Sequence, residues 1–453
     1  MKNRILILST FLFIGFLFSG ISSYGQYNLS TFYDNQHDVN AARFFPSELD
    51  LGNHHVQAGF DYYFWVGNNT IDYGSIQDLN SNKTINHDQV NNMISKINSN
   101  FILGFGQDIQ VLAIAYQYNT PKDDKHVVFT LSVDDKVAAN LIISQNLANL
   151  IWQGNGPFAG QTLNLDPISI NINYTREYAL GSTFTILGDE HEQEIRVGIR
   201  AKYIQGFGSM FMSNKNFNIY TDPQGKSVDV GFDYNINTSR TDNGFNLFNP
   251  SGYGGGVDFS ISYYPTSSLT FAAGITNLNY ITYNRDVITY TKAGTENYGG
   301  AIIQNVFGDF QFNPNQLTTV FVPQQTNGGS FKVPVSPDLN VLAEYQQIIL
   351  DKVKGDYPQN SVFLNYIQGF KNEPGTTVNP FISAGYTHGF GHTFNLGLST
   401  AYGGYNKFVC GPYASLYWSR KRISIGSDNL GGLLYTHYAT GLDLSIHFTD
   451  SFF

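Results

Sequence analysis

Residues 168–177 read ISININYTRE, and from Ile168 to Thr175 apolar and polar side chains alternate strictly. The same alternation recurs in residues 257–263 (VDFSISY), 394–399 (FNLGLS) and 442–448 (LDLSIHF). Successive side chains of a β-strand point to opposite faces, whereas a helix would spread such residues around its circumference. These segments are therefore predicted to be strands with one apolar and one polar face.

The composition of the two faces favours a membrane barrel over a soluble β-sandwich, in which the apolar face would be a core. The polar face carries mainly Ser, Asn, Thr and Gly, with few of the Lys and Glu residues that solvate a sandwich exterior. Only 13% of the residues are charged, against about 25% in a typical soluble domain. The chain contains 36 Phe and 30 Tyr, and they cluster near predicted strand ends, as an interfacial aromatic girdle requires.

We expect an all-β fold, a transmembrane antiparallel β-barrel of about 14 strands in a range of about 12 to 16. After the first 25 residues no segment approaches about 18 consecutive apolar residues, which excludes helical spans and leaves a closed barrel as the membrane-compatible form. The pattern predicts two separate strands at 100–107 and 109–118, and two more at 194–206 and 215–221. It predicts a single strand at 163–177. Two segments, 87–98 and 135–150, are predicted to be short helices that plug or cap the lumen.

The predicted connections alternate in length. Short turns at 264–268, 388–392 and 419–421 alternate with longer loops rich in Gly and Asn. Because bacterial barrels have short periplasmic turns and longer external loops, the carboxyl terminus is predicted to face the periplasm. Residues 283–337 then form a long external excursion.

The first residues are predicted to be a signal peptide, with an uncleaved anchor helix as the alternative. Lys2 and Arg4 precede an apolar run at 5–18 and a small, polar stretch at 19–25, so that a single barrel domain would occupy 26–453. Removing both cations changes the formal charge from −10 to −12, which argues against a nucleic-acid partner. Cys410 is the only cysteine and cannot form an internal disulfide.

Three phrases carry a resemblance to a known family. Residues 173–178 (NYTREY), 197–206 (VGIRAKYIQG) and 427–429 (SDN) resemble Bacteroidota outer-membrane barrel proteins whose function is not established. More loosely, the chain is similar to long-chain fatty-acid transporter barrels (FadL-like) and to shuttle barrels of type IX secretion (PorV-like). The resemblance implies an outer-membrane barrel of about 14 strands with a plugged or hatched lumen.

No catalytic machinery is apparent in the sequence, and we expect no enzyme activity, no cofactor and no metal. Residues 190–194 (EHEQE) lack the spacing of a zinc site and are interpreted as a solvated turn. His54 and His55 would point to opposite faces of a strand and could not share an ion. A barrel lipase would need a Ser, His and Asp or Asn constellation, and no Gly-x-Ser-x-Gly elbow occurs.

Charged residues on the polar face are the candidate functional residues. They are interpreted either as an internal salt-bridge network that braces the barrel or as a charged lining that selects a solute or anchors a plug. The alternation does not separate these alternatives. The possible lumen-lining residues are Arg196, Arg200, Lys202, Asp258, Glu344 and Asp443.

Two functions follow as hypotheses for a protein of the bacterial outer membrane, in contact with its lipid. The first is passage or binding of an apolar or amphipathic small molecule, which predicts a lumen pocket lined by aromatic residues and a helical hatch. The second is a non-transporting scaffold or shuttle for surface-protein export, which predicts other envelope proteins as partners.

Overall fold

The ring of strands follows from the pairing of neighbours along the chain and of the first strand with the last. The computed structural model describes residues 38–52, 54–72, 74–75, 87–119, 126–188, 193–240, 248–299, 323–350, 357–430 and 440–452. Within these residues, 14 antiparallel strands form a closed barrel, and the pairing of Val56 with Phe452 lies at its seam. In ring order the strands are β1 (Val56–Asn68), β2 (Asn100–Asn119), β3 (His126–Ser144), β5 (Ile168–Leu187), β6 (Glu194–Thr221), β8 (Gly252–Thr266), β9 (Leu269–Tyr283), β13 (Asp338–Ile349), β14 (Tyr357–Gly369), β15 (Phe381–Phe390), β16 (Phe394–Gly403), β17 (Phe408–Trp418), β18 (Lys421–Gly426) and β19 (Gly441–Phe452). The predicted closed barrel and its strand number are confirmed.

Side chains on each ring strand alternate between an exposed outer face and a buried inner face. On β8, Phe259 and Ile261 are 46% and 43% exposed, whereas Asp258, Ser260 and Ser262 are completely buried. On this strand the apolar residues thus lie outside and the polar residues inside, the reverse of a soluble protein. A sandwich core is excluded, because within the described residues the apolar face packs against no second sheet.

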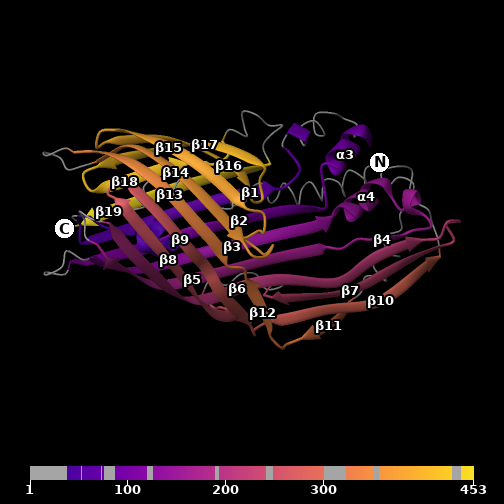
Figure 1. The fold of residues 1–453 in the computed structure, drawn as a ribbon. Helices are drawn as coiled ribbons and strands as arrows, with labels where there is room; N and C mark the ends of the chain where they lie inside the picture. Colours follow the sequence, from indigo (N-terminus) through magenta and orange to yellow (C-terminus); the bar gives the residue numbers. More distant parts are fainter. Residues whose placement is uncertain are drawn as a thin grey trace.

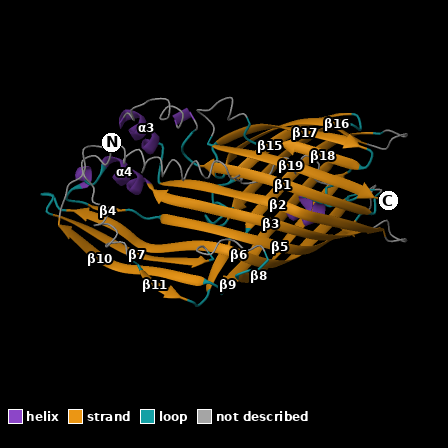
Figure 2. Ribbon diagram, turned by 180° about the vertical axis from the view of Figure 1, so that it is seen from behind, coloured by secondary structure: helices purple, strands orange, loops and turns teal. Residues whose placement is uncertain are grey.

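Several strands extend beyond the ring and carry an additional sheet at one end (Figures 1 and 2). The distal part of β6 pairs with β4 (Thr162–Asn164) and β7 (Ser227–Ser239), which continue into β10 (Val287–Gly299) and β11 (Gln324–Asn327). The strand β12 (Phe331–Val335) pairs with the carboxyl-terminal end of β9. The predicted excursion at 283–337 therefore contains strands of this extension, and its residues 300–322 lie outside the described part of the chain.

The predicted strand boundaries need three corrections. The segments 100–107 and 109–118 form the single strand β2, and 194–206 and 215–221 are both parts of β6. In β2 the interrupting residue, Asp108, is itself paired with Lys136, and in β6 residues 208–214 remain paired with β5 or β7 between bulges, so the interruption of the side-chain pattern does not end either strand. The predicted strand 163–177 is instead divided between β4 and β5.

The helix predicted at 87–98 is confirmed as α3 (His87–Ser95), but the helix predicted at 135–150 is wrong over most of its length. Residues 135–144 continue β3, because β2 and β5 supply backbone partners on both sides. The helix α4 (Gln145–Gln153) begins where Ser144 caps it by accepting a hydrogen bond from the Leu147 amide at 3.1 Å. A further 3-10 turn, η4, covers Gly156–Phe158.

Both helices lie beyond the ring and not in the lumen (Figure 1). They pack against each other through a cluster that contains Val90, Ile94 and Trp152. In the described part of the chain no helix is long and apolar enough to cross a bilayer.

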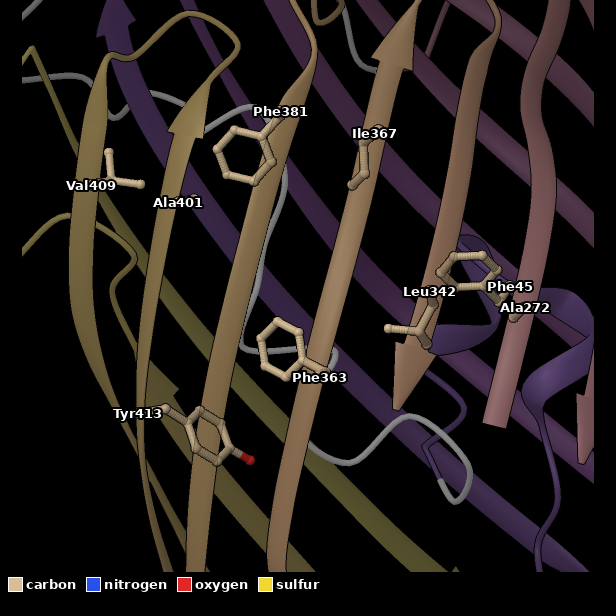
Figure 3. Close-up of a cluster of buried hydrophobic side chains, with 9 residues drawn as sticks. All are labelled: Phe45, Ala272, Leu342, Phe363, Ile367, Phe381, Ala401, Val409 and Tyr413. Carbon is tan, nitrogen blue, oxygen red and sulfur yellow. The ribbon is translucent and has the colours of Figure 1, made fainter. Parts of the chain in front are cut away.

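The lumen is instead occupied by residues 38–52, which we call the plug. It contains two 3-10 turns, η2 (Ala41–Arg43) and η3 (Pro46–Glu48). Phe45 is completely buried in a cluster of inward-facing side chains that includes Ala272, Leu342 and Phe363 (Figure 3). No role was predicted for this segment from the sequence, and of the two alternatives for the predicted helices, plugging or capping the lumen, plugging is not what the structure shows.

The connections differ in length at the two ends of the ring. At the end where β19 terminates, the turns after β8, β15 and β17 are short. At the opposite end lie α3, α4, the extension sheet and the connection between β14 and β15. This arrangement matches the predicted alternation of short and long connections.

Candidate lumen site

The plug is seated on the barrel wall through backbone and hydroxyl contacts. The Ser47 amide donates to Ser260 Oγ at 2.8 Å, and Ser47 Oγ lies 2.6 Å from Ser262 Oγ. The Pro46 carbonyl accepts a hydrogen bond from Thr183 Oγ1. At Gly198, a Cβ would lie only 2.2 Å from the Ser47 nitrogen, so the absence of a side chain there lets the plug backbone approach the wall.

Ion pairs join the charged residues of the plug to the wall. Arg43 pairs with Asp61 on β1 and, at 3.2 Å, with Asp108 on β2. Asp38 pairs with Arg422 on β18. These groups are mostly removed from water, so losing one partner would leave an uncompensated buried charge.

Asp50 adds a third attachment between the plug and the wall. Its carboxylate lies 2.8 Å from the Arg196 guanidinium on β6, and Arg196 also binds Glu194 at 2.7 Å. The aromatic ring of Tyr264 lies below the same guanidinium, 4.6 Å from ring centroid to Cζ. The plug is thus held to the wall by three separated ion-pair groups.

A second charge network connects four neighbouring strands above the plug. Arg200 on β6 contacts Asp134 on β3 at 2.6 Å and Asp258 on β8 at 3.3 Å. Lys202 contacts Asp258 at 2.8 Å and Glu177 on β5 at 3.6 Å. Glu177 also binds Lys136 on β3 at 2.8 Å, so the network continues around the wall.

The structure brings together only some of the residues predicted to line the lumen. All six are buried and inward-facing. Arg200, Lys202 and Asp258 share the wall network, whereas Arg196 holds the plug. Glu344 accepts from Ser361 Oγ at 3.0 Å, and Asp443 accepts from the Asp428 amide at 2.6 Å, both away from this network.

The charged residues of this region that were not predicted from the sequence include Lys136, Glu177 and Asp108. Lys136 fell in a predicted helix, where the inward or outward direction of a strand side chain is not defined. Asp108 was placed in a gap between two predicted strands, yet it pairs in register with Lys136. Glu177 stands at the end of the alternating phrase and could have been assigned to the inner face by continuing its parity.

A cavity of about 150 Å³ lies where the plug, the wall network and an inward-folded loop meet. The cavity combines charged and aromatic side chains on a polar wall. Its lining includes Arg43, Phe44, Tyr63, Trp65, Asp108, Lys136, Glu177 and Lys202, and residues 374–376 of the loop.

The loop between β14 and β15, residues 370–380, folds into the barrel from the end opposite the plug. Tyr405 donates from its hydroxyl towards the carbonyls of Glu373 and Thr376, at 3.0 and 2.7 Å. Thr376 Oγ1 donates to Asp338 at 2.7 Å. A Cβ at Gly375 would lie 3.6 Å from Ala138 Cβ on the opposite wall, so the loop spans the lumen.

The other sequence candidates add no chemistry to this site. Within the described residues, no group of three or more His, Cys, Asp or Glu side chains is arranged to hold a metal ion. Residues 190–192 of the acidic turn, and residues 1–25 of the predicted signal peptide, lie outside the described residues.

Comparison with protein families identifies the relatives of this chain. Residues 57–428 match the model described as "Family of unknown function (DUF5723)". The chain belongs to this family. No curated protein matches the sequence of this DUF5723 member.

Several solved structures are similar to this DUF5723 protein. One is the TodX deltaS2S3 mutant monoaromatic hydrocarbon channel, at 10% identity, with a TM-score of 0.46 over 95% of this chain and 96% of that one. The Pseudomonas putida toluene transporter TodX matches at 10% identity and a TM-score of 0.43, over 91% and 94%. A Pseudomonas aeruginosa FadL homologue matches at 8% identity and a TM-score of 0.44, over 96% and 99%.

Proposed function

We propose that this DUF5723 protein is a bacterial outer-membrane β-barrel that binds or passes a small amphipathic solute through its lumen. The exposed outer face supports the membrane placement. Large apolar side chains such as Leu180, Ile199 and Phe259 lie uncovered around the ring, and a soluble protein rarely exposes so continuous an apolar surface. A closed ring also leaves no strand edge unpaired in hydrocarbon.

The observation that carries the solute proposal is the composition of the lumen cavity. Phe44, Tyr63 and Trp65 supply apolar surface, while Lys136 and Glu177 supply charge on the same cavity. A pure hydrocarbon would displace water from the charged groups without replacing its hydrogen bonds, which is costly. An amphipathic solute satisfies both kinds of lining, so we favour it over an apolar one.

Passage, as distinct from binding, requires one of the two barriers to move. The plug and the loop at 370–380 bound the cavity from opposite ends. The plug is held by three groups of ion pairs, whereas the described contacts of the loop are mainly hydrogen bonds. We therefore propose that the solute enters the cavity from the end of the barrel at which the loop at 370–380 lies. Nothing in the fold or the comparisons supports the alternative role as an export scaffold, and we do not propose it.

Binding can be tested with Trp65, one of three Trp residues of the chain, because it lines the cavity. The full-length protein with Trp152→Phe and Trp418→Phe, folded in lipid vesicles, leaves Trp65 as the fluorescent reporter. A panel of small solutes with one ring, namely proline, pyrrolidine, cyclopentanecarboxylate and methylcyclopentane, is titrated. We expect a saturable change in Trp65 emission with at least one of them; no saturable change with any would overturn the proposed function.

A further inference from the structure

The charges that line the cavity are balanced in number, with Arg43, Lys136 and Lys202 against Asp108, Glu177 and Asp338. Lys136 and Asp108 are direct cross-strand partners on β3 and β2. Their side chains are 22% and 14% exposed, more than Glu177 at 6% or Lys202 at 1%. Lys136 and Asp108 are thus the charges of this set that a solute in the cavity can reach.

Asp108 has an acceptor that its surroundings leave unused. Arg43 lies 3.2 Å from Asp108 Oδ2. The other oxygen, Oδ1, is buried and has no hydrogen-bond partner among the residues that the structure describes. A buried carboxylate oxygen is normally hydrogen-bonded, so the Asp108 carboxylate keeps acceptor capacity that Arg43 does not use. The Asp108 carboxylate, which can accept from a cation, therefore stands beside the Lys136 ammonium, which can donate to an anion.

We propose that the cavity selects a zwitterion, a small solute that carries one ammonium and one carboxylate on a compact apolar body. This inference rests on the proposed function and specifies its solute class. The ammonium of the solute would pair with the Asp108 carboxylate, and the carboxylate of the solute would accept a hydrogen bond from Lys136. The two lining charges stand on directly paired strand positions, which matches the close spacing of opposite charges in an α-amino acid.

Electrostatics distinguishes a zwitterion from singly charged or neutral solutes. A solute with one charge adds net charge to a site whose lining charges already balance, and it leaves one of the reachable side chains without a ligand partner. A hydrocarbon satisfies neither side chain and removes water from both. Only a solute with both charges replaces the water at Asp108 and at Lys136 together.

The remaining surface of the cavity sets the size and nature of the solute body. Phe44, Tyr63 and Trp65 line the cavity beside these charges. A cavity of about 150 Å³ is comparable with one that accommodates a benzene molecule. The body is therefore a single small ring or a short branched chain, as in the smaller apolar amino acids.

The ring-matched panel tests this class directly, since its members differ in charge and share one ring. With the Trp65 reporter in vesicles at neutral pH, we expect proline to bind at least about tenfold more tightly than any other member. If pyrrolidine or cyclopentanecarboxylate binds as tightly as proline, the zwitterion proposal is overturned while the proposed function stands. If methylcyclopentane binds as tightly as proline, the amphipathic solute class of the proposed function is overturned as well. If none of the four binds, both are overturned.

Two substitutions in the full-length protein test which residue binds which charge of the solute. Lys136→Met should weaken the binding of proline and cyclopentanecarboxylate and leave that of pyrrolidine unchanged. Asp108→Asn should weaken the binding of proline and pyrrolidine and leave that of cyclopentanecarboxylate unchanged. Misfolding would weaken all solutes alike, so the opposite directions identify a direct role. Lys421→Met is the matched control, because Lys421 forms an exposed pair with Asp450 on the outer wall. Equal losses for all solutes in variants that keep the wild-type thermal midpoint would contradict the proposal.

Discussion

Gly198 on β6 marks the closest approach between the plug backbone and the barrel wall. An alanine Cβ there would lie 2.2 Å from the Ser47 nitrogen and 2.3 Å from the Pro46 carbonyl carbon, which are backbone atoms that cannot rotate away. We expect Gly198→Ala to displace the plug and to destabilise the protein by about 1–3 kcal/mol, as overpacking does in a close-packed interior. Planar-bilayer conductance should rise, because the lumen opens. Gly299→Ala is the control, since no atom lies within 4 Å of its added Cβ; equal conductance in both variants would argue against a seated plug.

Glu48 makes the stability of the folded plug depend on pH. Burial raises the pKa of this carboxyl above its usual value, against the opposing effects of Ser262, Arg196 and Tyr264. A raised pKa in the folded state means that its stabilising contribution is complete below the unfolded value of about 4.3 and is lost as pH rises through the folded pKa. We expect the thermal midpoint of the wild type to fall over that window and the midpoint of Glu48→Gln to change less. Circular dichroism melts across the pH range measure this, and parallel curves for the two proteins would refute it.

At the scale of single elements, the inward loop at 370–380 depends on a residue outside it. Tyr405 bonds two loop carbonyls through one hydroxyl and packs on Trp65 with ring centroids 4.8 Å apart. We expect Tyr405→Phe to keep the ring contact but to weaken the loop by about 1 kcal/mol, the usual net value of a buried hydrogen bond. The association rate of proline with the Trp65 reporter should therefore increase with little change in the thermal midpoint. An unchanged or slower rate would place solute entry elsewhere.

The strands and the plug differ in how far the sequence determines them. On β8 the parity of Asp258, Ser260 and Phe259 alone indicates which side chains face the lumen, because strand geometry has a period of two. The plug has no such signal: Val39, Phe45 and Leu49 follow no strand or helix period, and their partners lie on strands distant in the sequence. The same limit applies to the site, since strand parity gives the direction of Lys202 but not the register that brings it to Glu177.

For the molecule as a whole, the two ends of the barrel are unequal. The short turns lie where β19 ends, and the extension sheet, α3 and α4 lie at the opposite end. Short turns face the periplasm in bacterial barrels, so we infer that the extension sheet faces the exterior and the plug enters from the periplasmic side. This orientation places the loop at 370–380 towards the outside, which agrees with the entry side proposed above.

The placement of the whole barrel in a membrane can be tested on its outer face. Leu180 is 66% exposed on β5 and pairs with Ala201 about halfway up the ring, where the bilayer midplane would lie. We expect Leu180→Arg to cost about 2–4 kcal/mol, the range for a cation at the midplane on the lipid face of a barrel. The measurement is the urea dependence of folding into phospholipid vesicles. Leu350→Arg is the matched control, because Leu350 is 77% exposed just beyond the end of β13, where an added charge meets water or headgroups. If both substitutions cost the same small amount, hydrocarbon does not surround the ring, and the outward apolar face would need another partner to cover it.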